Sequence, residues 1–194
     1  AAKRRWLSLP AAGRIAVEAD GDWTLPIGTV LVKEFSLGGK RIETRLFVRH
    51  DDGGWAGYTY EWDDLETDAT LVPDGKTKTI GDQVWLYPNG SECLECHSDA
   101  AGGSLGLETA QLNRDFPAGA GRAGNQVDYL RGKGLFVTDP GEAASLPAYP
   151  ALDDESASLE DRARAYLHAN CSNCHRPGGT TQSTMDLRAS QTVS

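Results

Sequence analysis

The sequence predicts an α+β protein, in which a β-rich first half is followed by a loop-rich region with short helices. Before residue 90, four stretches alternate apolar and polar residues and are rich in β-branched and aromatic side chains. From about residue 89, glycine and proline instead punctuate short helical patterns. The composition, with 22 Gly, 9 Pro and 39% hydrophobic residues, agrees with a globular chain that contains many loops.

The predicted strands follow one another with short turns between them. Residues 28–37 ("GTVLVKEFSL") and 40–50 ("KRIETRLFVRH") flank "LGGK", which is typical of a hairpin turn. Residues 54–62 ("GWAGYTYEW") follow the turn "DDGG", and residues 79–88 supply a fourth strand. We therefore expect a small antiparallel sheet or meander within residues 1–90.

Four of the five tryptophans in this β-rich part of the chain are candidates for a carbohydrate-binding surface or a core: Trp23, Trp55, Trp62 and Trp85. Aromatic side chains on a sheet can bind carbohydrate, but large rings more often fill a core. We expect them to pack inside the protein.

The second half contains short predicted helices at 106–116 and 125–136, and then a Pro-rich linker at 146–156. The clearest helix follows, because Ser158 and Asp161 have the spacing of a capping box. Its apolar residues recur at helical spacing and form one stripe: Leu159, Ala163, Tyr166 and Leu167.

All four cysteines of the chain fall in two C-x-x-C-H pentads. This pattern is typical of covalent c-type haem attachment, in which two thiols add to the vinyl groups of one porphyrin and the adjacent imidazole meets the iron. We therefore predict two c-type haems. The cofactor-binding residues are Cys93, Cys96 and His97 in the first pentad, and Cys171, Cys174 and His175 in the second, with His97 and His175 as proximal iron ligands.

Three other uses of paired cysteines are known in proteins. A four-cysteine zinc site is one, but the pairs begin 78 residues apart (Cys93 and Cys171), and zinc gives no reason for a histidine after each pair. A thioredoxin-like dithiol needs a βαβ setting that the flanking sequence does not show. Disulfides within the pairs would close small, strained rings.

The two haems suggest three regions along the chain. Residues 1–90 would pack on the first haem, 91–145 would carry that haem among short helices, and 146–194 would carry the second. Because c-type haem is attached outside the cytoplasm, we expect a periplasmic or extracellular protein.

The net charge of −9 disfavours nucleic acid and anionic membranes as partners. No apolar run approaches the length of a membrane span, and no signal-peptide core opens the chain, so we expect a mature soluble fragment.

The sixth ligand of each iron decides between electron transfer and catalysis. Met185, the only methionine, and His50, at the end of a predicted strand, are the candidate distal ligands. His168 precedes Cys171 by three residues on the same predicted helix, so it would serve only the other haem. Arg176 and Tyr87 are weaker candidates for contacts to haem propionates.

The sequence resembles a family of bacterial dihaem c-type cytochrome domains. The resemblance covers nearly the whole chain and rests on "WTLPIGTVLVKEF", "RIETRLFVRHDDGGWAGYTYEWDD", "WLYPNGSECLECH", "LGLETAQLN" and "RARAYLHANCSNCHRPGG". It implies an electron-transfer module, linked to enzymes such as quinone-dependent sugar dehydrogenases or polysaccharide monooxygenases. It also implies that the helix before Cys171 delivers the second pentad as in small cytochromes c.

One departure from this family concerns the end of the sequence. The family continues past the second pentad with a Met-bearing loop and a terminal helix, whereas this sequence ends 19 residues after His175. We therefore expect a fragment of a longer protein with a partial second haem region.

The predicted function is electron transfer between a periplasmic or extracellular redox enzyme and another redox partner. The alternatives are a dihaem peroxidase, which needs one iron with an open distal position, and a zinc protein that uses both pentads. No confident distal base is visible in the sequence, so electron transfer is favoured over an enzyme.

Overall fold

The computed structural model describes residues 1–191, which fall into two compact units. Unit 1 comprises Ala1–Gly13 and Pro26–Glu95. Unit 2 comprises Arg14–Leu25 and the chain from Cys96 onward. Each unit is therefore assembled from two separate stretches of sequence.

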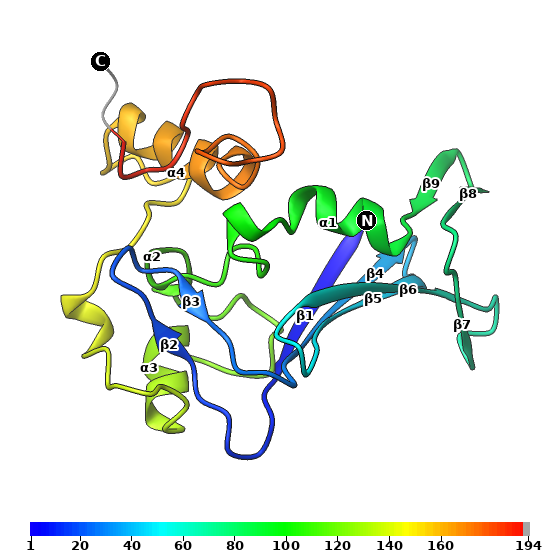
Figure 1. Cartoon of the computed structure of the whole chain (residues 1–194), viewed down its shortest axis with the longest axis horizontal. Helices are drawn as coiled ribbons and strands as arrows, with labels where there is room; N and C mark the ends of the chain where they lie inside the picture. The colour runs from blue at the N-terminus through cyan, green and yellow to red at the C-terminus, as the bar shows by residue number, and fades with distance from the viewer. Residues whose placement is uncertain (192–194) are drawn as a thin grey trace. The chain divides into compact units, whose positions relative to one another are not determined.

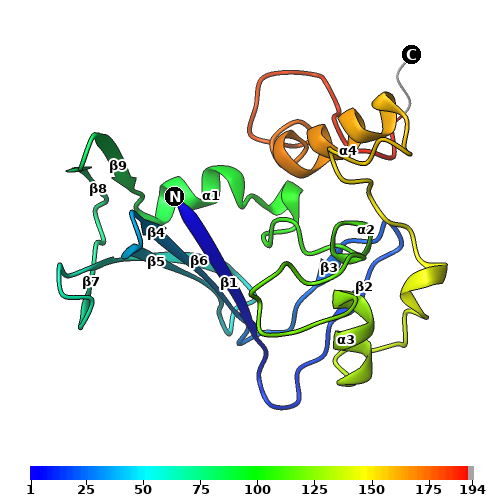
Figure 2. The same ribbon diagram turned by 180° about the vertical axis from the view of Figure 1, so that it is seen from behind.

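Unit 1 is organised around a five-stranded antiparallel sheet with the order β1-β4-β5-β6-β7 (Figure 1, and from behind in Figure 2). Its strands are β1 (Ala2–Ser8), β4 (Val30–Leu37), β5 (Lys40–Arg49), β6 (Trp55–Trp62) and β7 (Ala69–Leu71). A separate hairpin of β8 (Lys76–Ile80) and β9 (Gln83–Tyr87) leads into helix α1 (Gly90–Cys96).

The α+β class is confirmed, and the strands predicted at 28–37, 40–50 and 54–62 correspond to β4, β5 and β6. The prediction of a single strand at 79–88 is wrong. Ile80 pairs with Gln83 across a two-residue turn, so this stretch contains the end of β8 and all of β9. Gly81 in the turn has φ 58°, a left-handed conformation that glycine adopts without a steric penalty.

Aromatic side chains fill the interior of unit 1. Phe47 is buried and stacks on Trp55, with ring centroids 5.0 Å apart. Phe35 is buried and meets the Trp85 ring edge-on at 5.5 Å. Trp55 and Trp85 are themselves half-buried, so they pack against the core phenylalanines but are not enclosed inside the protein as predicted.

Unit 2 contains short elements joined by loops. They are β2 (Ala16–Val17), β3 (Trp23–Thr24), the 3-10 turns η1 (Asp99–Ala101) and η2 (Ala143–Ser145), and the helices α2 (Thr109–Leu112), α3 (Gln126–Gly132) and α4 (Leu159–Cys171). Its core includes Ile15, Val127 and Trp23, whose ring meets Phe136 edge-on at 5.2 Å. The Trp23 indole N–H donates to Thr109 Oγ1 at 3.0 Å, so this buried polar atom is satisfied.

Helix α4 begins where the capping box predicts. Ser158 Oγ accepts a hydrogen bond from the Asp161 backbone N–H at 3.0 Å. The apolar stripe of the helix, however, is not its buried side, because Leu159 is 75% exposed whereas Ala165 is 6% exposed. The small Ala165 side chain therefore lies on the side of α4 that packs within unit 2, and the larger apolar side chains of the stripe face solvent.

Candidate haem-attachment sites

Helix α1 presents the first cysteine pair. Asn89 and Glu92 bond reciprocally at its start: Asn89 Oδ1 accepts from Glu92 N–H at 2.9 Å, and Glu92 Oε2 accepts from Asn89 N–H at 2.8 Å. Cys93 and Cys96 follow with i, i+3 spacing, which places them on the same side of a helix. The Cys93 side chain is half-buried and the Cys96 side chain is exposed.

A glycine of the sheet makes room for the Cys93 thiol. A Cβ atom added at Gly57 on β6 would lie 2.6 Å from Cys93 Sγ and 2.8 Å from its Cβ, closer than real Cβ contacts. Gly57 thus allows α1 to approach the sheet. Burial raises the pKa of the Cys93 thiol, and the charge of Arg45 only partly opposes this shift.

The histidine of the first pentad has a fixed tautomer. His97 Nδ1 lies 2.7 Å from the Gly103 carbonyl oxygen. Because a carbonyl oxygen only accepts, Nδ1 carries the hydrogen and the lone pair of the neutral ring is on Nε2. A metal-ligating histidine is commonly oriented by such a bond from its other ring nitrogen.

The second pentad lies at the end of α4. Cys171 is the last residue of the helix, and its carbonyl oxygen accepts from the backbone N–H groups of Cys174 at 3.1 Å and His175 at 2.9 Å. A tight turn therefore brings the two cysteines and the histidine together along the chain. His175 Nδ1 is buried and has no hydrogen-bond partner among residues 1–191. A buried ring nitrogen in this state is destabilising unless a bound group or a shift of the ring satisfies it.

Arg176 connects the segments that follow the two pentads. Its Nε donates to the Ser172 carbonyl oxygen at 2.8 Å, and its Nη1 donates to the Ala100 carbonyl oxygen at 3.0 Å. Ala100 is three residues after His97, and Arg176 directly follows His175. Unit 2 thus holds the two histidine-bearing segments against each other.

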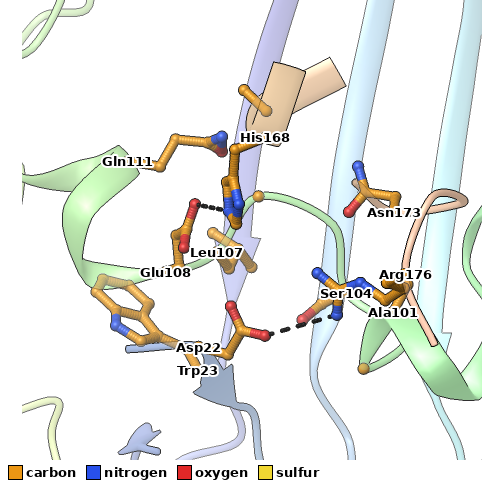
Figure 3. A pocket seen from close by; sticks show the side chains of 13 residues that line it. Asp22, Trp23, Ala101, Ser104, Leu107, Glu108, Gln111, His168, Asn173 and Arg176 are labelled. Carbon is orange, nitrogen blue, oxygen red and sulfur yellow. Dashed lines mark hydrogen bonds and ion pairs between the residues drawn. The ribbon is translucent and has the colours of Figure 1, made fainter. Parts of the chain in front are cut away.

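A polar cluster lies beside this junction (Figure 3). It surrounds a cavity of about 30 Å³, which has room for a water molecule. His168 Nδ1 accepts from the Ala189 backbone N–H at 3.0 Å, so its Nε2 donates to Glu108 Oε1 at 2.8 Å. Both ring nitrogens of His168 therefore form hydrogen bonds within unit 2. Close by, burial raises the pKa of Asp22, and Asp20 and Glu108 add to the shift by repulsion.

The sequence did not indicate this cluster. Glu108 and His168 are 60 residues apart, and no local spacing links them. The remaining polar residues that line the cavity are Asp22, Ser104, Gln111, Asn173 and Arg176. Only the folded chain brings them together.

The two candidate distal ligands lie in different units. Met185 is 58% exposed in the loop after the second pentad, and the Leu187 N–H bonds to the His175 carbonyl oxygen at 2.9 Å. In unit 1, His50 Nε2 lies 2.9 Å from the hydroxyl of Tyr58. Tyr58 is next to Gly57 on β6, so its side chain is on the other face of the sheet from Cys93. His50 thus contacts a side chain on the face of the sheet opposite to Cys93.

Tyr87 and Arg176, the two candidates for contacts to haem propionates, instead form hydrogen bonds to backbone carbonyl oxygens. The Tyr87 hydroxyl is buried and donates to the Ile42 carbonyl oxygen at 3.2 Å, and burial raises the pKa of Tyr87 to about 12. The guanidinium of Arg176 bonds to the two carbonyl oxygens described above.

The chemistry of both pentads fits a covalently bound haem. All four cysteines lie in the described range, and none of them forms a disulfide there. Residues 1–191 contain no group of three or more His, Cys, Asp and Glu side chains arranged to hold a metal ion.

Among the helices of that same range, none has the length and apolar character needed to cross a membrane.

Comparison of the chain with protein-family models, with curated proteins and with solved structures found no match.

Proposed function

We propose that the protein is a dihaem c-type cytochrome that carries electrons between a periplasmic or extracellular redox enzyme and a second redox partner. The observation that carries this proposal is the pair of C-x-x-C-H pentads, with His97 held in the tautomer of an iron ligand by Gly103.

The residues that would hold the cofactors follow from the pentads. Cys93 and Cys96 would form the thioether bonds to one haem and Cys171 and Cys174 those to the other, and His97 and His175 would bind the irons. A bound haem would supply a reversible one-electron change at its iron.

The chain's own contribution is to hold and orient these groups. Gly57 gives the Cys93 thiol its place beside the sheet, and Gly103 orients the His97 ring. Arg176 ties the segment after His97 to the segment after His175 through Ala100. Two redox centres held at a fixed separation would exchange electrons readily, because the protein need not change conformation to bring them together before each transfer.

The resemblance to bacterial dihaem cytochrome domains supports the same function. Under this proposal the partner is a redox protein such as a quinone-dependent dehydrogenase or a polysaccharide monooxygenase. The net charge of −9 favours a partner with a basic docking surface and predicts association that weakens as salt is added.

A redox titration with charged probes tests the proposal. The protein is produced with periplasmic export and haem maturation, and its visible spectrum is followed as electrons are added. We expect two one-electron equivalents per chain. We also expect faster exchange with a cationic redox probe than with an anionic probe of similar potential, and a smaller difference at high salt. A chain that takes up no electrons would overturn the proposal. If the rate of electron exchange is the same for the cationic and anionic probes, the expectation of a partner with a basic docking surface is wrong.

A further inference from the structure

Three basic side chains of unit 1 stand directly opposite one another on neighbouring strands. The register pairs Arg5 of β1 with Lys33 of β4, and Lys33 with Arg45 of β5. Directly opposite residues project from the same face of a sheet with Cβ atoms about 5 Å apart, and like charges in this arrangement repel. Such a row needs an explanation in a chain whose net charge is −9.

The nearest carboxylate neutralises one member of this cationic row. Glu43 is fully buried and accepts from Arg45 Nε at 2.5 Å and from Arg45 Nη2 at 3.0 Å. Its Oε2 also accepts from the Trp85 indole N–H at 2.9 Å. The bonding capacity of Glu43 is therefore directed at Arg45 and Trp85, and Glu43 would itself repel a second anion.

The other two cations lack a carboxylate partner. Within residues 1–191, neither Arg5 nor Lys33 forms an ion pair, and the Lys33 ammonium lies 5.1 Å from the centre of the Phe35 ring. Burial lowers the pKa of Lys33 to about 8, and repulsion from Arg5, Lys3 and Arg45 adds to the shift. An anion placed at this row would remove the repulsion.

The row ends at an unsatisfied hydroxyl. Arg45 pairs with Thr59 on β6, whose side chain projects from the same face. Thr59 is 2% exposed, and within the described chain its Oγ1 has no hydrogen-bond partner. Because this hydroxyl is enclosed by the protein, the accessible donors of the row are its basic side chains.

The attachment cysteine lies on the same face, one row along the strands. Phe47 is opposite Gly57, two residues from the pair of Arg45 and Thr59, and the Cys93 thiol packs against the position of the Gly57 Cβ. Two residues of a strand span about 7 Å. The thiol and the cationic row are thus neighbours on one surface, and the charge of Arg45 acts on the Cys93 thiol.

We propose that Arg5 and Lys33, with the charge of Arg45 beside them, form a carboxylate-binding site for the propionates of the haem that Cys93 and Cys96 attach. This inference rests on the proposed function, because the haem is its source of carboxylates. Guanidinium groups bind carboxylates through two parallel hydrogen bonds. Covalent attachment at Cys93 would give the propionates a high local concentration at the row, which a free anion lacks.

Single charge removals test this site in the dihaem protein. The variants are Lys33→Gln and Arg5→Gln, and the matched control is Lys40→Gln, an exposed lysine at the start of β5. Both midpoint potentials are measured by spectroelectrochemical titration, with and without added phosphate. Loss of a nearby cation favours the ferric state, so at a fixed potential the ferric-to-ferrous ratio of one haem should rise about fivefold. For a one-electron couple this equals a fall of about 40 mV.

The outcomes separate the possible anions. A fall in one potential for Lys33→Gln and Arg5→Gln, unaffected by phosphate and absent in Lys40→Gln, supports the propionate site. A fall that depends on phosphate assigns the row to a free anion and overturns the propionate assignment. If both haems are attached and neither potential changes, this inference fails while the proposed function stands. A wild-type protein without haem fails the proposed function instead. Because the Arg5 side chain is exposed, Arg5→Gln serves if Lys33→Gln does not fold.

Discussion

Replacement of Gly57 by alanine tests the contact that places the first pentad on the sheet. The added Cβ would lie 2.6 Å from Cys93 Sγ and 2.8 Å from Cys93 Cβ, so α1 or β6 must shift to relieve the overlap. Overpacking of this kind typically lowers the free energy of unfolding by 1–3 kcal/mol, and we expect about 2 kcal/mol for Gly57→Ala. Displacement of the thiol should also lower the fraction of chains that carry a haem at this pentad.

The assay combines urea unfolding with intact-mass measurement of haem content. The control is Gly132→Ala at the end of α3, where an added Cβ would meet no atom within 4 Å. This control should be neutral or stabilise the protein by up to about 1 kcal/mol, because alanine is the better helix former. The reasoning about Gly57 would be refuted if Gly57→Ala matched the wild type in both stability and haem content.

Three further predictions address other parts of the chain. Ser158→Ala removes the N-cap of α4 and should lower the free energy of unfolding by about 1 kcal/mol in urea titrations; an unchanged value would show that the cap is not stabilising. The pKa of Lys33 falls from the 10.5 of an ordinary lysine to about 8 on folding, so between these pH values its contribution to the free energy of unfolding of the haem-free protein should grow as pH rises. The wild type should therefore gain stability relative to Lys33→Gln over this range, and a difference between them that does not change with pH would contradict the shift. If Met185 binds the second iron, the oxidised protein should show the near-infrared absorption of a methionine–ferric bond, and Met185→Leu should remove it; a band that survives in Met185→Leu excludes this ligand.

Much of unit 1 was predictable because its strands follow a simple local rule. β4, β5 and β6 have the β-branched and aromatic content of strands, although burial does not alternate along them, because Glu34 is buried beside Phe35 and Glu43 beside Ile42. β1 (Ala2–Ser8) was not predicted, because consecutive charged residues replace alternation in "AKRRWLS" and pairing with β4 determines its structure. The β8–β9 hairpin was mistaken for one strand because its two-residue turn interrupts the pattern only at Gly81 and Asp82.

The residues of the candidate sites were likewise predictable only where they lie close together in the sequence. The cysteine pairs and their histidines were visible because haem attachment requires a fixed local spacing. The cluster of Glu108 and His168 and the row of Arg5, Lys33 and Arg45 were not visible, since each depends on contacts between residues distant in the sequence. The apolar stripe of α4 shows a further limit, because helical periodicity identifies a face but does not say what covers it.

Haem content per chain is the most direct test of the central claim. Intact mass is measured for the wild type produced with haem maturation, for Cys93→Ser/Cys96→Ser, and for Cys171→Ser/Cys174→Ser. We predict a mass excess of two haems in the wild type and of one haem in each double variant. A wild type without covalent haem, or with a bound metal ion instead, would contradict the assignment of the protein as a dihaem cytochrome.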